Sequence, residues 1–323
     1  MSGWRLILVV FALILVFDVC ANSSFSNSMI TVGSLRLQVH VEGKGIPAVV
    51  IDSGIAVEMD TLKSFRERIA KFTQVITYNR AGYGQSEPGP LPRDGAREAE
   101  ELKKLLQKSS VPGPYILVGH SLGALNVMIF ASKYPKDVAG LVLLDPPPLT
   151  FVLGKEYREL GVMMEKMTLE WQGIADSMAK SNNEKDRVRS SFFRMIASEH
   201  REMVKTAKMV DAISTFGSIP LIVIASGKPN PAFGQDAEKF QQYWVDQSRL
   251  LTRKSTKSNF IYAEKSTHFL YVDVPDRVEE SIRSLVNGIR KKYRNSSFKN
   301  RASVSPFSFH ATLHFFCLSL FPL

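Results

Sequence analysis

The sequence predicts an α/β protein, with a mostly parallel central sheet flanked by helices and an inserted helical lid. Two patterns carry this prediction over most of the 323 residues. Short continuous apolar runs, typical of strands buried on both faces of a sheet, alternate with segments whose apolar residues recur at helical spacing. Parallel strands connected by helices produce such an alternation. One long interval interrupts it and contains no convincing strand.

The individual elements follow in order along the chain. Apolar and polar residues alternate from Leu35 to Val41, which indicates a half-buried antiparallel strand. Strands buried on both faces are expected over residues 48–51, 75–78, 115–118, 141–144, 221–225 and 260–263. Helices are expected over residues 62–69, 98–106, 122–134, 240–251 and 278–289. Because 45% of the residues are hydrophobic and 22% are charged, the chain has ample material for a large core.

The interval without strands lies between Asp145 and Pro220 and has 74 residues. It carries amphipathic windows over 157–178 and 188–209. It also holds seven of the eleven methionines, namely Met163, Met164, Met167, Met178, Met195, Met203 and Met209. Flexible thioethers suit the adaptable roof of an apolar pocket, although the same side chains could form the insert's own core. We interpret residues 146–219 as a helical lid.

A candidate nucleophile lies where the third buried strand meets its helix. The apolar run 115–118 leads into Gly119-His120-Ser121-Leu122-Gly123, which has the spacing Gly-x-Ser-x-Gly. A sharp strand-to-helix turn of this kind exposes the serine at the top of a sheet, and the flanking glycines avoid Cβ clashes. The pentapeptide alone is common, but strand, turn and helix appear here in the required order.

Several blocks together resemble the α/β-hydrolase superfamily, over about residues 30–292. The segment Tyr78-Asn79-Arg80-Ala81-Gly82-Tyr83-Gly84-Gln85-Ser86 is similar to a block that precedes the nucleophile in serine hydrolases with Tyr-Asp-Arg-Ala-Gly-Tyr-Gly-x-Ser. Asn79 departs from the usual Asp. Further matching blocks are 113–115 with 119–123, 138–145 and 266–269. The resemblance implies an esterase-like serine hydrolase with a helical lid, and Ser121 argues against the dehalogenase and epoxide hydrolase branches, which use Asp at that position.

Serine needs a base to accept its proton, and His268 has the expected position after the last strand. His120 is interpreted as a structural neighbour of the nucleophile. The third member of a catalytic triad is an acid that orients this base. Much of the superfamily has Asp where Asn230 stands here. By resemblance the acid can also follow the preceding strand, where Asp145 stands, so Asp145 is the preferred acid, Asp236 is the alternative, and a triad without a carboxylate is the third possibility.

An oxyanion hole requires two preorganised donors. The backbone N–H of Leu122, the residue after the nucleophile, is expected to be one. By resemblance, the second is the N–H of Ile55, in the loop Asp52-Ser53-Gly54-Ile55-Ala56. Many relatives have His-Gly where this chain has Ser53-Gly54.

The sequence therefore predicts a serine hydrolase that cleaves a small-molecule ester or similar acyl compound through an acyl-serine intermediate, with no organic cofactor and no metal. An acyltransferase is one alternative, and a slow or non-catalytic ligand-binding or interaction protein on the same fold is another. Asn79 and Asn230 are the two features that favour the non-catalytic alternative. No oligomeric state is indicated.

The termini carry separate signals. Arg5 precedes an apolar run over 6–17, and Val19-Cys20-Ala21 offers a cleavage point, so residues 1–21 are expected to be a signal peptide of a secreted protein. An uncleaved membrane anchor is the less favoured interpretation, because the run is shorter than the roughly 20 residues that span a bilayer. Asn22 and Asn295 begin glycosylation acceptor patterns.

The formal charge of +10 comes largely from the C-terminal region, where seven Lys or Arg follow Glu280 and no acidic residue does. The body is close to neutral, which argues against nucleic-acid binding. The core is expected over 29–145 and 220–292, followed by a disordered basic and apolar tail over 293–323. This tail leaves membrane association open, through its basic residues or through a lipid-anchor signal.

Overall fold

The computed structural model describes residues 28–302 and contains one eight-stranded sheet. Its strand order is β1-β2-β4-β3-β5-β6-β7-β8. The strands are β1 (Ser28–Val32), β2 (Leu35–Glu42), β3 (Val49–Asp52), β4 (Val75–Tyr78), β5 (Tyr115–His120), β6 (Val138–Leu144), β7 (Leu221–Ser226) and β8 (Ser258–Ala263). Strands β1 and β2 are antiparallel to their neighbours, and all pairs from β4 to β8 are parallel. The predicted fold class is confirmed, and β1 is an addition that the sequence pattern did not indicate.

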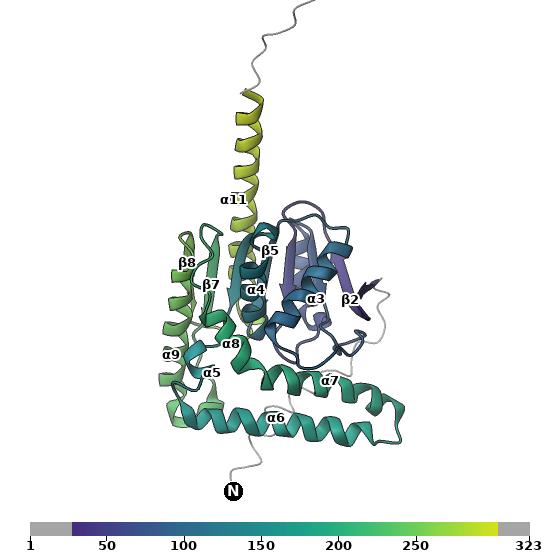
Figure 1. Cartoon of the computed structure of the whole chain (residues 1–323). Helices are drawn as coiled ribbons and strands as arrows, with labels where there is room; N and C mark the ends of the chain where they lie inside the picture. The colour runs from purple at the N-terminus through teal and green to yellow at the C-terminus, as the bar shows by residue number, and fades with distance from the viewer. Residues whose placement is uncertain (1–27, 303–323) are drawn as a thin grey trace, which may run out of the picture.

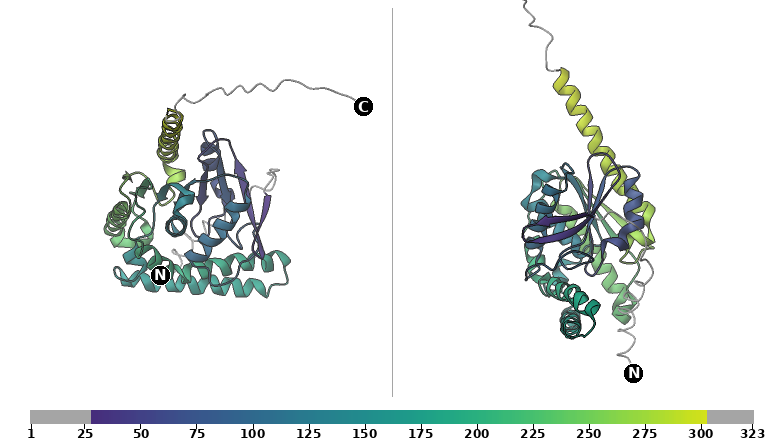
Figure 2. Two further views of the ribbon diagram at one scale, coloured as in Figure 1. Left: turned by 45° about the horizontal axis from the view of Figure 1, so that its top comes forward. Right: turned by 90° about the vertical axis from the view of Figure 1, so that its right-hand side faces the viewer.

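Helices cover both faces of the sheet because successive strand residues point to opposite sides (Figure 2). Leu141 and Leu143 face a core shared with helices α3 (Gly95–Lys108) and α4 (Leu122–Lys133). Val142 and Leu144 face a second core shared with helices α2 (Lys63–Ala70) and α11 (Pro275–Ala302). Helix α9 (Ala237–Leu250) packs against β7.

The segment between β6 and β7 is entirely without strands and forms four helices. They are α5 (Leu149–Val152), α6 (Arg158–Ala179), α7 (Glu184–Arg201) and α8 (Met203–Asp211). Helices α6 and α7 lie side by side across one end of the sheet (Figure 1). The second predicted window, 188–209, is two helices that meet at Glu202, and α8 packs against α4 through Ala207 and Val210 in the main core.

The last helix, α11, is longer than its apolar pattern indicates. Ile289 is buried, residues 291–295 are exposed, and the helix continues to Ala302. Its C-terminal half projects away from the body at the end of the sheet opposite α6 and α7 (Figure 1). The boundary expected at residue 292 therefore falls inside a helix, and residues 293–302 are helical where disorder was expected.

None of the helices between residues 28 and 302 is both long enough and apolar enough to cross a membrane. The expected signal peptide over 1–21, the acceptor Asn22 and the final segment 303–323 lie outside the described residues.

Candidate active site

The proposed nucleophile occupies a strained turn between β5 and α4. Ser121 has φ 53° and ψ −120°, a backbone conformation that residues other than glycine rarely adopt. The flanking glycines are required by close packing, because a Cβ on Gly119 would lie 2.5 Å from the Gly123 carbonyl oxygen and one on Gly123 would lie 2.3 Å from that of Asp52. Strain at such a position is characteristic of functional sites.

A carboxylate lies against the proposed base. Nδ1 of His268 is 2.6 Å from Oδ2 of Asp145. Asp145 follows β6 directly, is 2% exposed, and has a positive φ of 46°. Ser226, at the end of β7, donates its N–H to Oδ1 at 2.8 Å and its hydroxyl to Oδ2 at 2.9 Å. These two hydrogen bonds, one to each carboxylate oxygen, orient the Asp145 carboxylate toward the imidazole.

The other two candidates for this position have different surroundings. Asp236 is exposed at the boundary between a 3-10 helix (Pro231–Asp236) and α9, and its side chain makes no capping bond. Asn230 accepts a hydrogen bond from the Ala232 N–H at 3.0 Å and caps that 3-10 helix. The residue that replaces the usual Asp therefore has a local structural role.

The loop after β3 lies against the nucleophile. A Cβ on Gly54 would come within 3.3 Å of the Ser121 Cβ and 2.9 Å of His120 Nδ1, so only glycine fits there without displacement. Within residues 28–302, neither the Ile55 N–H nor the Leu122 N–H has a hydrogen-bond acceptor. These are the two donors expected to form the oxyanion hole.

His120 supports the loop that carries His268. Its Nε2 lies 2.9 Å from the carbonyl oxygen of His268, and the two ring centroids are 4.6 Å apart. Burial lowers the pKa of His120 well below its usual range, and the nearby His268 lowers it further. A neutral His120 that donates from Nε2 fits this environment and agrees with the role of structural neighbour.

A cavity of about 280 Å³ connects the site with the inserted helices. Ser121, His268 and Ile55 line it from the core, while Glu58 and Arg189 contribute charged side chains. Its apolar wall from α6 and α7 consists of Met167, Trp171, Phe192, Phe193 and Ile196. Of the seven methionines expected in the insert, Met167 contributes to this wall, whereas Met195 packs beside the buried Tyr83.

Sequence reasoning missed four residues near the site. Arg80 and Tyr83 belong to the block 78–86 that resembles serine hydrolases, but neither had an expected role. Ser226 ends a strand without any distinguishing pattern. Glu199 contacts Arg80 across 119 positions of sequence, and nothing in an amphipathic helix marks such a partner. Within the described residues, no group of three or more His, Cys, Asp or Glu side chains is placed to hold a metal ion.

Comparison with known proteins agrees with this fold. Residues 64–260 match the family model described as alpha/beta hydrolase fold. The chain belongs to this family. It is 27% identical over 244 residues to the protein YqjL of Bacillus subtilis, covering 75% of this chain and 85% of that protein.

Some relatives carry hydrolase names. The chain is 28% identical to the 2-(acetamidomethylene)succinate hydrolase of Mesorhizobium japonicum, over 40% of this chain and 45% of that enzyme. It is 34% identical to a putative carbamate hydrolase, RutD, of Klebsiella pneumoniae, over 31% of this chain and 38% of that protein. The match spans less than half of either hydrolase.

Among solved structures, a thermophilic esterase from Thermogutta terrifontis superimposes with a TM-score of 0.62 at 19% identity, covering 82% of this chain and 99% of the esterase. A putative epoxide hydrolase from Pseudomonas aeruginosa gives 0.57 at 20% identity, over 83% and 97% of the two chains. At these identities, the two structures show a shared fold and no more.

Proposed function

We propose that this protein is a serine hydrolase that cleaves carboxylic esters or similar acyl compounds through an acyl intermediate on Ser121. The observation that carries the proposal is the 2.6 Å contact between His268 Nδ1 and Asp145, made where His268 and Ser121 line one cavity. With Nδ1 bound to the carboxylate, Nε2 is the nitrogen that accepts the serine proton. The hydrolase relatives and the family support the same class of chemistry.

The reaction begins when Ser121 Oγ attacks the carbonyl carbon of the substrate and His268 takes the hydroxyl proton. The N–H groups of Ile55 and Leu122 stabilise the negative oxygen of the tetrahedral intermediate, and one such donor contributes about 3 to 4 kcal/mol. His268 then protonates the leaving alcohol. Water activated by the same imidazole attacks the acyl-serine and releases the acid.

Asp145 keeps its contact with the imidazole through this cycle. It holds the imidazole in the tautomer whose Nε2 is unprotonated and stabilises the imidazolium that forms after proton transfer. The two hydrogen bonds from Ser226 hold the carboxylate in place against the imidazole. Burial keeps water from weakening the contact with His268.

The wall formed by Trp171, Phe192 and Phe193 favours an apolar group on the substrate. An ester of a short or medium aliphatic acid fits a cavity of about 280 Å³. Neither asparagine that favoured a non-catalytic protein now does so, because Asn230 is a helix cap and Asn79 is held by bonds to Gln38 and the Met59 N–H.

Hydrolysis of 4-nitrophenyl butanoate tests the proposal. The wild-type protein should release nitrophenolate, and Ser121→Ala and His268→Ala should each abolish release while circular dichroism shows that both remain folded. Triad members act as a unit, so each single loss approaches the loss of all. Transfer of the butanoyl group to an added alcohol in preference to water would indicate an acyltransferase instead.

A further inference from the structure

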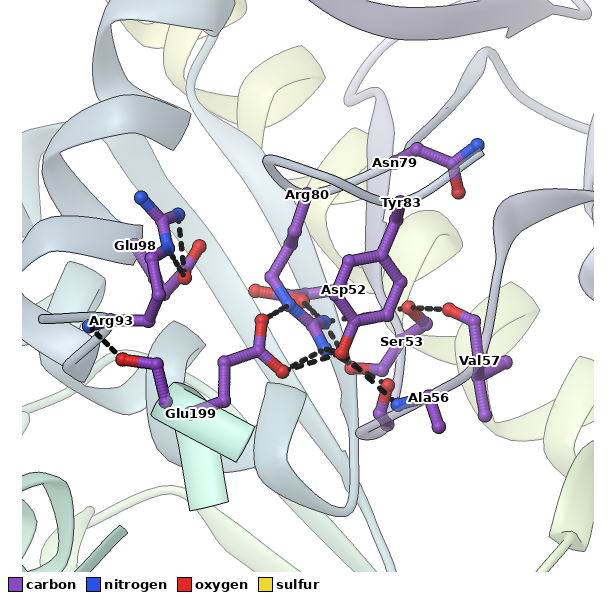
Figure 3. A network of polar contacts seen from close by, with 12 residues as sticks. Asp52, Ser53, Ala56, Val57, Asn79, Arg80, Tyr83, Arg93, Glu98 and Glu199 are labelled. Atoms are coloured by element: carbon purple, nitrogen blue, oxygen red, sulfur yellow. Dashed lines mark hydrogen bonds and ion pairs between the residues drawn. The ribbon is translucent and has the colours of Figure 1, made fainter. Parts of the chain in front are cut away.

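The loop over residues 52–56 carries the Ile55 N–H and is the oxyanion loop of the proposed site. A buried cluster of charged and polar side chains lies behind it (Figure 3). Arg80 and Tyr83 follow β4, Asp52 ends β3, and Glu199 comes from α7 of the insert. All four side chains are almost completely inaccessible to solvent. Arg80 donates to Asp52 at 2.8 Å through Nη1 and to Glu199 at 2.8 Å through Nε, so its charge is compensated on two sides.

The same guanidinium binds the backbone of the loop. Nη1 of Arg80 donates to the Ser53 carbonyl at 2.6 Å, and Nη2 donates to the Gly54 carbonyl at 3.0 Å. In a planar trans peptide the C=O and the N–H point in opposite directions. Fixing the Gly54 carbonyl toward Arg80 therefore directs the Ile55 N–H away from Arg80.

The next peptide is fixed by Tyr83. Its hydroxyl oxygen accepts a hydrogen bond from the Ala56 N–H at 3.1 Å and donates to Glu199 Oε2 at 2.5 Å. Ala56 has φ 61°, in the left-handed region that residues with a side chain rarely adopt. A specific partner is needed to hold that conformation, and the Tyr83 hydroxyl is that partner. Both peptides that flank Ile55 are thus held by one cluster.

Glu199 links this arrangement to the insert. One of its oxygens accepts from Arg80 Nε and the other accepts from Tyr83, so both loop-holding side chains are oriented by a residue of α7. Helix α7 also supplies Phe192, Phe193 and Ile196 to the cavity wall. The residues that bind the substrate's apolar group and the residue that orients the loop lie on one helix.

We infer that Arg80, Tyr83 and Glu199 are positioning residues, which hold the Ile55 N–H in its oxyanion-binding direction. Because Glu199 belongs to α7, that direction depends on the position of α7 against the core. The inference rests on the proposed function. It assigns to the insert a part in the chemical step, in addition to covering the cavity. Loss of the cluster should weaken stabilisation of the tetrahedral intermediate more than it weakens substrate binding.

The test compares two conservative tyrosine variants. Tyr83→Phe removes the acceptor for the Ala56 N–H. Tyr115→Phe removes a buried hydroxyl that donates to the Val111 carbonyl, and Tyr115 lies at the start of β5, at the opposite end of that strand from Ser121. With 4-nitrophenyl butanoate, Tyr83→Phe should lower kcat by about 10- to 100-fold, less than the loss of a whole oxyanion donor, with KM within about threefold of wild type. Tyr115→Phe should leave kcat within about twofold.

A second pair keeps the test decisive if stability changes. Glu199→Gln removes the charge that orients Arg80 and Tyr83, and Glu101→Gln removes a buried charge that pairs with Arg93 and does not touch the loop. Both should lower the melting temperature, and Glu199→Gln alone should lower kcat by tenfold or more. If Glu199→Gln does not fold, the tyrosine pair decides.

The outcomes separate the two proposals. A wild-type protein that neither hydrolyses the ester nor reacts with a fluorophosphonate overturns the proposed function. An active wild type whose Tyr83→Phe variant has the same kcat as Tyr115→Phe overturns the positioning role. A rise in KM at constant kcat also overturns it, because that pattern indicates lost binding and not lost transition-state stabilisation.

Discussion

Asp145 and His268, 123 positions apart in sequence, meet through a 2.6 Å contact between Oδ2 and Nδ1. Each follows a strand of the parallel sheet, β6 and β8, whose carboxyl ends lie at the same edge. The sheet therefore brings together two residues that no local sequence feature connects.

The first prediction concerns the acid. Asp145→Asn should lower ester turnover by up to about 10⁴-fold, because an asparagine favours the wrong imidazole tautomer and cannot stabilise the cation. Asp236→Asn and Asn230→Ala should change turnover only a few fold, since neither side chain contacts His268. Steady-state kcat for the three variants gives the ranking. Near-equal small effects would indicate a triad without a carboxylate, and a dominant effect of Asp236→Asn would move the acid to the later loop.

The second prediction concerns the cavity wall. Trp171→Ala should enlarge the cavity and raise the ratio of kcat/KM for 4-nitrophenyl octanoate over butanoate by about tenfold or more. One additional methylene accommodated in a hydrophobic pocket contributes about 1 to 3 kcal/mol, which corresponds to about tenfold or more. Val162→Ala, at an exposed position of the same helix, is the matched control and should leave the ratio unchanged. An unchanged ratio in both variants would place the acyl group elsewhere.

The third prediction is a pH dependence of stability. His200 lies 2.5 Å from the Thr168 hydroxyl through Nδ1 and packs edge-on against Trp171. Burial lowers the pKa of His200 to about 4, from the usual 6.5. The unfolded chain therefore binds this proton more readily than the folded one, and the stabilisation that is complete above pH 6.5 is lost as the pH falls toward 4.

Urea unfolding of wild type and His200→Phe at several pH values measures this effect. The free energy of unfolding of the wild type, relative to the variant, should fall by about 3 kcal/mol between pH 7 and pH 4. Parallel stability curves for the two proteins would show that His200 does not resist protonation in the folded state.

The fourth prediction concerns the C-terminal helix. Truncation after Tyr293 should leave turnover and melting temperature essentially unchanged, because residues 291–295 are exposed while Arg290 still donates to the carbonyls of Ile46 and Phe72. Arg290→Ala is the contrasting variant and should lower the free energy of unfolding by about 1 to 3 kcal/mol through the loss of two charge-assisted hydrogen bonds. If truncation unfolds the protein, the projecting half of α11 contributes to the fold.

The comparison of sequence with structure shows where local patterns are sufficient. The strand over 75–78 was predicted with its observed bounds, because a short continuous apolar run indicates burial on both faces. Ser121 was recognisable as a candidate nucleophile because the tight turn requires a glycine two residues before it and another two residues after it. Asp145 could be preferred over Asp236 because the resemblance implies an acid after one of two strands, and Asp145 directly follows the earlier of them.

Other features depend on contacts that sequence periodicity does not carry. Glu199 has the same appearance as a solvated charge on an amphipathic helix, yet it is buried against Arg80 and Tyr83. The full length of α11 was not predicted, because its apolar repeat ends at Ile289 while the polar residues beyond it still form helix. The break between α7 and α8 was missed for the opposite reason, since apolar spacing continues across Glu202.

The most direct test of the account is covalent labelling with a fluorophosphonate, followed by mass spectrometry of the peptides. Such a probe forms a bond to serine only where a base and an oxyanion hole activate the hydroxyl, so a pocket alone does not suffice. We predict one phosphonate on Ser121 in the wild type, and none at this position in Ser121→Ala or His268→Ala. Labelling that persists in Ser121→Ala, or a wild-type protein that takes up no label, would contradict it.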